Sequence, residues 1–505
     1  MRPSSSPVAS SEEAPPRMYF IPFPTPGHAL PMSDLARLFA SRGADATLVL
    51  TRANAARLGG PVARAAAAGL RIRVHALTLP AGAAGLTGGH ESADDLPNRE
   101  LAGPFAVAVD LLAPLFADLL RREPADAVVF DGVLPWAATA AAELGIPRYA
   151  FTGTGCFALS VQRALLLHSP QDGAASDAEP FLVPGLPDAV RLTRARLAEA
   201  TLPGAHSREF LSRMYDAERA TAGWVVNTYA DLERRYVEHY ERDTGKPVFA
   251  VGPVCLVNAD GEDTLERGRG GEAGAAAEAA RVMAWLDAKP AGSVVYVCFG
   301  SLTRFPREQV VELGMGLAGA GVDFVWVVGD KAAALPDIDG ATAAGRGLVV
   351  RGWAPQVAVL RHAAVGAFVT HCGWGAVTEA AAAGVPVVAW PVFAEQFYNE
   401  ALVVGVAGTG AAVGAERGYV WGGEELGGVV VGREAVAARV RAAMADEVLR
   451  RRARDAGERA RRAVEEGGSS YEAVGALLED VLRRRRRRRR GESGGEIARA
   501  RAAPI

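Results

Sequence analysis

The sequence predicts an α/β protein with two doubly wound domains, each built on a parallel sheet. The chain has 505 residues and 50% of them are hydrophobic, which is enough for more than one core. Short apolar runs that end in glycine-containing turns alternate with helical patterns in both halves of the chain. Between the halves, residues 258–278 are rich in Gly, Glu and Ala and lack periodicity, which indicates a solvated linker.

The N-terminal domain is expected over residues 18–255. The preceding segment, 1–17, is rich in Pro, Ser and Glu and has no apolar run, which is typical of a disordered segment. The domain then shows a strand, a turn, a helix and a second strand, at 19–23, 24–28, 32–41 and 46–50. Its later strands are expected at 127–130, 146–151 and 224–228.

Two polar residues follow strands of this domain. His28 lies on the loop after the first strand, and Asp131 ends the strand at 127–130. Ligands of parallel sheets bind at the carboxyl ends of the strands, so both residues occupy positions where catalytic groups are expected. From the residues alone, a surface loop histidine and a helix-capping aspartate are the alternative interpretations.

The C-terminal domain is expected over 281–462, after an interdomain linker at 256–280. An apolar strand at 293–299 ends in a turn that contains Ser301. Helix, strand, helix, strand and helix then follow one another at 356–363, 367–372, 376–383, 386–390 and 395–404. This order predicts crossover connections onto a parallel sheet, with chemistry at the strand-to-helix turns.

One of these turns predicts an anion site. Its residues are His371, Cys372, Gly373, Trp374, Gly375 and Ala376. The glycines let the backbone approach a ligand, and the start of the following helix presents free N–H groups and the positive end of the helix dipole. A phosphate or diphosphate fits such a site, with a further hydrogen bond from the histidine.

Other side chains of the same stretch suit the remaining parts of a nucleotide sugar. Glu379 lies about one turn beyond the glycines, where a carboxylate can accept two ribose hydroxyls. Glu395 and Gln396 stand at the next strand-to-helix turn and suit sugar hydroxyls, and Trp353 supplies a flat ring for a base. The stretch therefore predicts a site for a nucleotide sugar.

The stretch from Trp353 to Gln396 resembles the signature motif of the plant secondary-product (family 1) UDP-glycosyltransferases, which opens with Trp and closes with Gln. The matching residues are Trp353, Ala354, Gln356, His371, Gly373, Trp374, Glu379, Pro391, Glu395 and Gln396. The phrases GKPVFAVGPV, SVVYVCFGSL and EQFYNEALVV are also similar to this family, in the branch that glycosylates flavonoids, terpenoids, steroids and hormones. The resemblance covers roughly residues 19–482.

The resemblance implies two facing Rossmann-like domains of the GT-B type with a cleft between them. It implies that Trp353 stacks on uracil, that Gln356 and Glu379 bind the ribose, and that His371 binds the diphosphate. Glu395 and Gln396 would bind sugar hydroxyls. The rest of the implied UDP-sugar site consists of Ser301, Ala354, Gly373, Trp374, Gly375 and Ala376. The family normally has Asn-Ser at the last two positions, so this chain is expected to hold its donor less tightly.

The resemblance also implies a mechanism. His28 takes the proton from an acceptor hydroxyl, Asp131 orients the imidazole, and the oxygen displaces UDP from the sugar with inversion. Gln396 implies UDP-glucose as donor, and either Thr152 or Thr154 is expected to contact the sugar. A small aglycone is the second substrate, and no cofactor or metal is implied. A UDP-sugar-binding protein with little turnover and a sugar-nucleotide epimerase are the alternatives.

Composition restricts the partners. The formal net charge is −3 although the run from Arg483 to Arg490 is included, so the rest of the chain is more acidic and general nucleic-acid binding is not expected. Four cysteines, Cys156, Cys255, Cys298 and Cys372, show no metal or pairing spacing and predict buried thiols in a cytoplasmic protein. We expect no membrane-spanning segment and a monomer.

Two motifs and the C-terminal region complete the predictions. The sequence at 314–319 matches G-x-G-x-x-G but falls late in a predicted helix, and Asp337-Ile338-Asp339 resembles a metal-binding motif without further ligands, so neither is assigned a role. The resemblance implies a closing helix at 463–482 that packs back on the N-terminal domain. The segment 483–505 is expected to be a disordered arginine-rich tail, with contact to a membrane surface or RNA as the lesser alternative.

Overall fold

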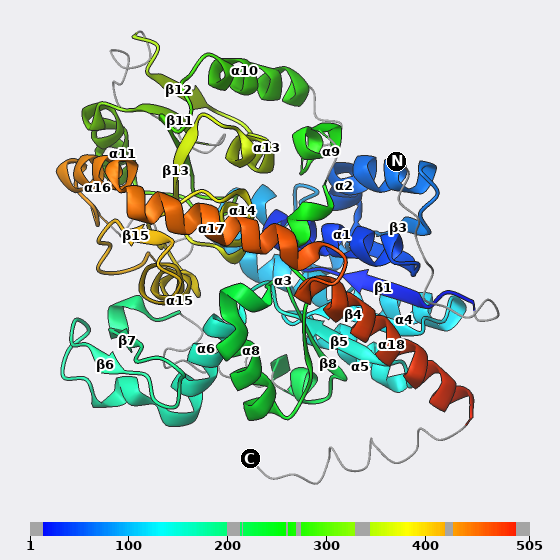
Figure 1. Cartoon of the computed structure of the whole chain (residues 1–505). Helices are drawn as coiled ribbons and strands as arrows, with labels where there is room; N and C mark the ends of the chain where they lie inside the picture. Colours follow the sequence, from blue (N-terminus) through cyan, green and yellow to red (C-terminus); the bar gives the residue numbers. More distant parts are fainter. Residues whose placement is uncertain are drawn as a thin grey trace.

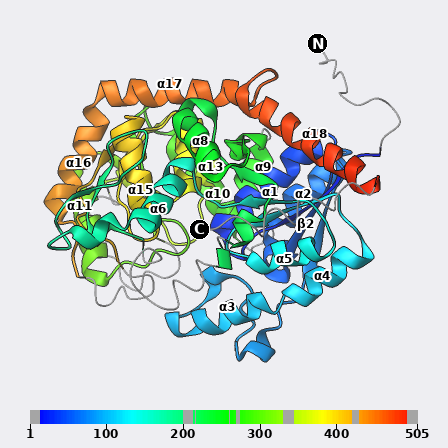
Figure 2. The same ribbon diagram turned by 90° about the horizontal axis from the view of Figure 1, so that it is seen from below.

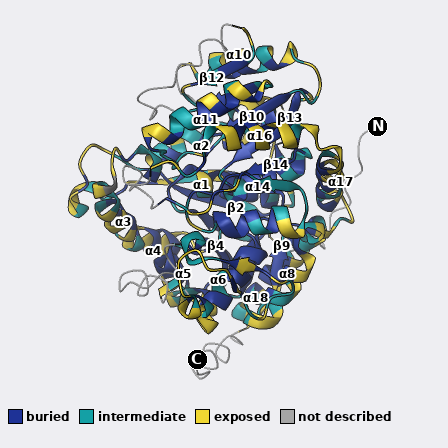
Figure 3. Cartoon of the chain, turned by 90° about the vertical axis from the view of Figure 1, so that its left-hand side faces the viewer, coloured by how far each residue is buried: buried dark blue, intermediate teal, exposed yellow. Residues whose placement is uncertain are grey.

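The computed structural model describes residues 14–198, 213–214, 216–258, 261–268, 274–328, 344–419 and 428–490. Two α/β domains lie beside each other, and the helices α17 and α18 run across both (Figures 1 and 2). In Figure 3 the strands at the centre are buried, and exposed residues lie mainly on the outer helices and loops. The predicted fold class is confirmed.

The N-terminal domain is built on a seven-stranded parallel sheet with the order β3-β2-β1-β4-β5-β8-β9. Every residue of β4 is buried, because helices cover both faces of the sheet. The strands are β1 (Arg17–Ile21), β2 (Asp45–Thr51), β3 (Ile72–Leu77), β4 (Ala127–Asp131), β5 (Arg148–Phe151), β8 (Gly223–Val226) and β9 (Val248–Ala250). The helices are α1 (Pro26–Ser41), α2 (Arg52–Ala67), α3 (Ala102–Asp110), α4 (Ala113–Arg122), α5 (Pro135–Glu143), α6 (Cys156–His168) and α8 (Ala230–Thr244).

Smaller elements complete this domain. An antiparallel hairpin pairs β6 (Phe181–Leu182) with β7 (Arg191–Leu192). The short 3₁₀ helices are η1 (Ala81–Ala84), η2 (Ala93–Asp95), η3 (Arg99–Leu101), η4 (Pro170–Gly173), η5 (Arg194–Arg196) and η7 (Val254–Val257).

The C-terminal domain has a six-stranded parallel sheet with the order β12-β11-β10-β13-β14-β15. Its strands are β10 (Val294–Cys298), β11 (Asp323–Val327), β12 (Gly347–Val350), β13 (Val365–Thr370), β14 (Val387–Ala389) and β15 (Gly410–Ala412). Its helices are α10 (Ala275–Asp287), α11 (Arg307–Ala320), α13 (Gln356–Arg361), α14 (Trp374–Ala383), α15 (Gln396–Glu400), the π-helical η8 (Ala401–Val406), α16 (Arg433–Ala445) and α17 (Glu447–Val464).

The G-x-G-x-x-G sequence lies inside α11, as predicted, and serves helix packing. A Cβ atom at Gly316 would stand 2.6 Å from the Cβ of Val436 on α16, so the glycine allows the two helices to approach closely. The Asp337-Ile338-Asp339 sequence lies outside the described residues.

The closing helix α18 (Ser469–Arg489) packs on the N-terminal domain, as the resemblance implied. Val474, Leu477 and Val481 join the apolar cluster that contains the core residues of β1 and α1. Tyr149 also donates a hydrogen bond to Asp480 at 2.5 Å. The helix therefore ties the end of the chain to the first sheet.

The predicted disordered tail is wrong for residues 483–489, which continue α18. The prediction from the arginine run alone overlooked acceptors that the fold brings close. Arg484 pairs with Asp480 at 2.7 Å, one turn earlier. Arg485 is only 4% exposed and donates to Asp126 at 3.1 Å and to the carbonyl of Ala14 at 2.8 Å. Arg485 lies four residues after the buried Val481, on the same face of the helix, while Arg483 and Arg486 are exposed.

Three further boundaries differ from the prediction. Arg17 already belongs to β1, so the described fold begins before residue 18. The predicted linker 256–280 contains η7, the helix α9 (Gly261–Glu266) and the start of α10. Asp263 of α9 is buried, so this part of the linker is packed and not solvated. The C-terminal domain accordingly starts at 275, before the predicted 281.

The segment Ala102–Arg122 is long and apolar enough to cross a membrane by length and composition alone, which the expectation of no membrane-spanning segment did not take into account. It comprises α3 and α4, which contribute Phe105, Ala108, Phe116 and Leu120 to the main apolar core of the chain. Core helices of this composition satisfy the same criterion.

Candidate active site

A cleft of about 770 Å³ lies between the two domains, where the carboxyl ends of both sheets face each other. The N-terminal wall follows β1 and β5 and includes Thr25, His28 and Gly153. The C-terminal wall follows β10, β12, β13 and β14. It contains Ser301, Trp353, Ala354, Gln356, His371, Gly373, Trp374, Gly375, Ala376, Glu379, Glu395 and Gln396. The structure therefore gathers the predicted site residues around one cleft, with Asp131 directly behind His28.

His28 and Asp131 form a hydrogen-bonded pair. Nδ1 of His28 lies 2.7 Å from Oδ2 of Asp131, which is fully buried. The carboxylate also accepts the backbone N–H groups of Phe23 at 3.0 Å and Val133 at 3.3 Å, so its position is fixed. His28 stands in the first turn of α1 and not on the expected loop, because the helix begins at Pro26. Because Nδ1 bonds to Asp131, Nε2 is the ring nitrogen that can interact with a ligand in the cleft.

Burial and charge act in opposite directions on His28. Burial lowers the pKa of the imidazole, but the carboxylates of Asp131 and Glu395 favour the charged form and raise that pKa above its ordinary value of 6.5. Glu395 belongs to the other domain, so both walls of the cleft contribute. An imidazole held by a buried carboxylate in this way can serve as a general base.

His371 lies against the N-terminus of α14 and is tightly enclosed. A Cβ at Gly373 would stand 2.5 Å from its Nε2, and one at Gly300 would stand 2.9 Å from it, so the ring requires glycine at both positions. Burial lowers the pKa of His371 to about 4. The neutral ring can therefore donate a hydrogen bond to an anion without adding a full charge.

Backbone strain marks the turns that follow β13 and β14 in the C-terminal wall. Cys372 has φ +62° and Ala394 has φ +54°, although neither is glycine. Such conformations cost of order 1–3 kcal/mol each and concentrate at ligand sites. The sequence pattern placed Cys372 in the predicted anion turn but did not predict the positive φ of either residue.

The Trp374 side chain contacts the other domain and leaves only its backbone for an anion. The indole is 2% exposed, and its Nε1 donates to the carbonyl of Asn227 at 2.9 Å. A Cβ at Gly155 would stand 2.5 Å from the ring. By contrast, the space beside Gly375 is open: apart from its chain neighbours and the local helix backbone, no atom of the described residues lies within 4 Å of a Cβ built on it.

The predicted nucleoside residues lie together at one end of the cleft. Gln356 donates to Oε2 of Glu379 at 2.7 Å. Arg267, which sequence reasoning missed, donates to Oε1 of Glu379 at 2.5 Å, and its carbonyl accepts from Nε1 of Trp353 at 3.2 Å. A lone arginine in a Gly- and Glu-rich stretch has no motif that could have revealed it.

The expected sugar-binding pair stands at the start of α15. Oε1 of Gln396 accepts the N–H groups of Val392 at 2.9 Å and Phe393 at 3.0 Å, so the amide nitrogen is the part that can face a sugar. Glu395 accepts from Asn399 at 3.3 Å, and burial raises the pKa of its carboxyl. Two backbone N–H groups therefore fix the orientation of the Gln396 amide.

The turn after β5 leaves the choice between its two threonines open. The Thr152 hydroxyl donates to the carbonyl of Thr154 at 3.3 Å. The Thr154 hydroxyl is buried without a hydrogen-bond partner among the described residues. Gly153 between them contacts His28, since a Cβ there would stand 3.4 Å from the ring.

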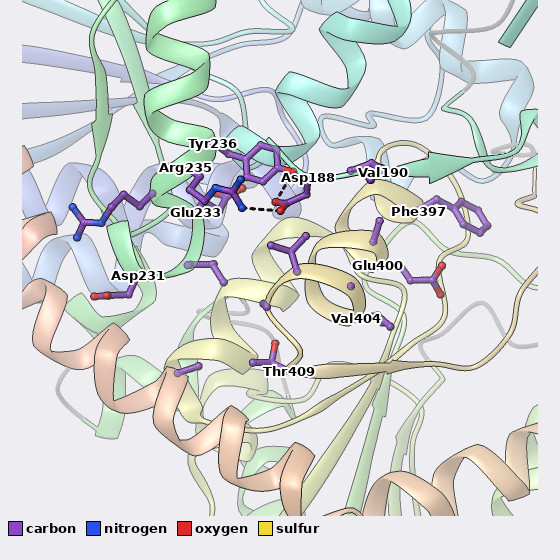
Figure 4. A pocket seen from close by; sticks show the side chains of 18 of the residues that line it. Asp188, Val190, Asp231, Glu233, Arg235, Tyr236, Phe397, Glu400, Val404 and Thr409 are labelled. Atoms are coloured by element: carbon purple, nitrogen blue, oxygen red, sulfur yellow. Dashed lines mark hydrogen bonds and ion pairs between the residues drawn. The ribbon is translucent and has the colours of Figure 1, made fainter. Parts of the chain in front are cut away.

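A second cavity, of about 940 Å³, lies apart from this cleft, between the start of α8 and η8 (Figure 4). Asp188 on its wall accepts from Arg235 at 2.7 Å and from Tyr236 at 3.1 Å. Burial raises the pKa of the Glu400 carboxyl to about 7. The lining of this cavity does not include His28 or any other predicted site residue.

Comparisons with known proteins identify the family of the chain. A family model described as UDP-glucoronosyl and UDP-glucosyl transferase matches residues 273–418. The chain is 39% identical to scopoletin glucosyltransferase from Nicotiana tabacum, over 92% of this chain and 97% of that protein. It is also 39% identical to UDP-glucose flavonoid 3-O-glucosyltransferase 7 from Fragaria ananassa, over 92% of this chain and 96% of that protein.

A solved structure is similar over almost the whole chain. A Glycyrrhiza uralensis protein crystallised with glycyrrhetinic acid 3-O-monoglucuronide has a TM-score of 0.87 and 34% identity, over 96% of this chain and 99% of that one. The structural similarity to this protein therefore includes both domains and the cleft between them.

Proposed function

This chain belongs to the plant family 1 UDP-glycosyltransferases, and from that membership we propose that it transfers glucose from UDP-glucose to a hydroxyl group of a small lipophilic plant metabolite. The observation that supports the proposal is the position of the His28–Asp131 pair across the cleft from the N-terminus of α14. A base on one wall and an anion site on the other suit displacement of a nucleoside diphosphate by a hydroxyl.

The reaction that we propose is a single displacement. Nε2 of His28 accepts the proton of the acceptor hydroxyl while the oxygen forms a bond to C1 of the sugar, and the bond from C1 to the diphosphate oxygen breaks. Asp131 keeps the imidazole oriented and stabilises the imidazolium that forms. Attack from the side opposite UDP inverts the anomeric centre from α to β.

The departing diphosphate gains charge as the bond breaks. Backbone N–H groups at the start of α14 and the neutral His371 ring are placed to donate hydrogen bonds to it. Trp353 would stack on the uracil, and Gln356 and Glu379 would take the ribose. The groups assigned to the glucose hydroxyls are Glu395 and the amide nitrogen of Gln396.

The acceptor side of the cleft favours an apolar molecule with few polar groups. Phe23 lies edge-on to His28, with ring centroids 5.8 Å apart, and Leu30 and Pro31 of the same helix as His28 also line the cleft. The relatives that act on scopoletin and on flavonoids have acceptors of this kind.

The test is a screen of phenolic and terpenoid acceptors with UDP-glucose, in which product is detected by mass. The proposal expects a glycoside and an equal amount of UDP. Conversion of UDP-glucose into another nucleotide sugar would indicate an epimerase, and binding without product would indicate a binding protein. His28→Ala is expected to remove transfer while UDP still binds, because the assigned UDP residues lie on the other domain.

A further inference from the structure

Arg267 touches two assigned nucleoside residues at once. Its guanidinium is 9% exposed and donates from Nη1 to Oε1 of Glu379 at 2.5 Å. Its backbone carbonyl accepts from Nε1 of Trp353 at 3.2 Å. The next residue, Gly268, has φ +91°, and a Cβ there would stand 2.5 Å from the Trp353 ring. One short segment therefore contacts the residues assigned to the ribose and the base.

The same guanidinium reaches the N-terminal domain. Nε and Nη2 of Arg267 lie 3.0 Å and 2.8 Å from Oδ2 of Asp34 on α1. The other oxygen of Asp34 accepts from Asn258 at 2.9 Å, so this carboxylate is also fixed. Burial opposes the charge on Arg267, but the carboxylates of Asp34 and Glu379 outweigh that effect and raise its pKa. The guanidinium links the two domains through two carboxylates.

The segment that carries Arg267 is anchored independently. Asp263 of α9 pairs with Arg37 of α1, and it also accepts from Arg64 of α2 at 2.8 Å. Figure 1 shows α9 between α13 of one domain and α2 of the other. The backbone at residue 267 is therefore held in place by contacts that do not include Glu379.

These contacts define the direction in which Glu379 points. Arg267 occupies one carboxylate oxygen and Gln356 the other, at 2.5 Å and 2.7 Å. Each carboxylate oxygen can accept more than one hydrogen bond, so ribose hydroxyls can still donate to this group. Arg267 gives Glu379 one hydrogen bond, from Nη1, while Nε and Nη2 bond to Asp34. Because the guanidinium is planar and rigid, its two contacts with Asp34 also fix the direction of Nη1 toward Glu379.

We propose that Arg267 is a positioning residue of the donor site, which holds Glu379 in the orientation that binds the ribose hydroxyls of UDP-glucose. The inference rests on the proposed function, because it takes Glu379 as the ribose-binding carboxylate. Arg267 then contributes to recognition of a ribonucleotide without contacting the reacting atoms.

The experiment compares UDP with 2′-deoxyuridine diphosphate, which lacks one hydroxyl of the ribose. Binding of both is measured by calorimetry on the full chain, as purified and as Arg267→Gln and Arg267→Lys. The unmodified chain is expected to prefer UDP by about tenfold or more, the effect of one hydrogen bond to a charged group. Arg267→Gln is expected to lose most of that preference. Arg267→Lys keeps the positive charge but not the planar set of donors, and it is expected to lose part of the preference.

Kinetic measurements and a control variant distinguish a loss of Glu379 positioning from a general disturbance of the fold. Arg267→Gln is expected to raise KM for UDP-glucose with little change in kcat, since the ribose contact is present before and during transfer. Arg64→Gln is the matched control, because Arg64 holds the same segment through Asp263 but does not contact Glu379. It is expected to keep the preference for UDP.

Several outcomes would overturn the inference. An unchanged preference for UDP in either folded Arg267 variant would show that the guanidinium does not orient Glu379. Tighter UDP binding by Arg267→Gln would show that Arg267 occupies the ribose position and must leave it. If the unmodified chain neither bound UDP nor formed a glycoside, the proposed function would fail together with this inference.

Discussion

Replacing Asp131 with asparagine tests the base most directly. The substitution keeps the size of a fully buried side chain but removes the carboxylate that lies 2.7 Å from Nδ1 of His28. The same carboxylate accepts the N–H groups of Phe23 and Val133, and an amide oxygen can retain one of these bonds. The fold is therefore expected to survive, while the orientation and the proton affinity of the imidazole change.

The expected loss follows from the role of the pair. Positioned general-base catalysis contributes roughly 10²–10⁴-fold to a rate, so Asp131→Asn is expected to lower kcat/KM by a factor within that range. In free energy of activation this is about 3–5 kcal/mol, at about 1.4 kcal/mol for each factor of ten. UDP affinity should stay unchanged, because the assigned UDP residues lie on the opposite wall.

The pH dependence of activity gives a second test, in which the direction of the shift is predicted. A base must be neutral to accept a proton, so activity rises as pH passes the pKa of His28, which Asp131 and Glu395 place above 6.5. Without the Asp131 charge, burial is less opposed and the pKa of His28 falls. The rising limb of the pH profile is therefore expected at lower pH in Asp131→Asn, even though the plateau is lower.

Initial rates of glycoside formation are measured at saturating UDP-glucose across the pH range. They give both the maximal activity, which is the plateau, and the pH at which activity rises, which is the limb. Asp188→Asn is a suitable control, because Asp188 is paired with Arg235 in the other cavity and does not contact His28. A plateau equal to that of the unmodified chain, or a limb that moves to higher pH, would refute the assignment of Asp131 as the partner of the base.

Three other outcomes are expected. UDP-glucose should be preferred over UDP-galactose in a competition assay, as the resemblance at Gln396 implies, and the reverse preference would count against it. Gly375→Asn combined with Ala376→Ser should lower KM for UDP-glucose, because the space beside Gly375 is open and hydrogen bonds to a charged group contribute about 1.5–3 kcal/mol each; unchanged kinetics would mean that the diphosphate lies elsewhere. Activity should persist in excess EDTA, since α14 and His371 provide the groups proposed to stabilise the leaving group, and a loss restored by Mg²⁺ would contradict this.

The sheets and the strand-end turns were predictable from the sequence because their cause is local. Strands such as β4 and β13 are buried along their whole length and read as apolar runs. The glycines at 300 and 373 mark turns where the backbone and the His371 ring approach each other closely. The resemblance to the plant family added the roles of His28 and Asp131, which the pattern alone had left open.

What the sequence could not show depends on partners far away in the chain. Arg267 is separated by 233 positions from Asp34 and by 112 from Glu379. Arg485 is separated by 359 positions from Asp126. The composition of the two segments predicted that both arginines are solvated. Composition depends only on neighbours in the sequence, whereas the carboxylates that bind these arginines come close only in the folded chain.

Residues assigned to the donor also connect the two domains. Trp374 bonds to Asn227 across the interface, and Arg267 joins Glu379 to the first domain. Glu395, on the donor side, raises the pKa of His28 on the acceptor side. Its effect on that pKa depends on how near the two walls stand, because a charge interaction weakens with distance and with entry of water. A donor that draws the walls together would therefore increase the proton affinity of His28 at the moment when the acceptor hydroxyl must be deprotonated.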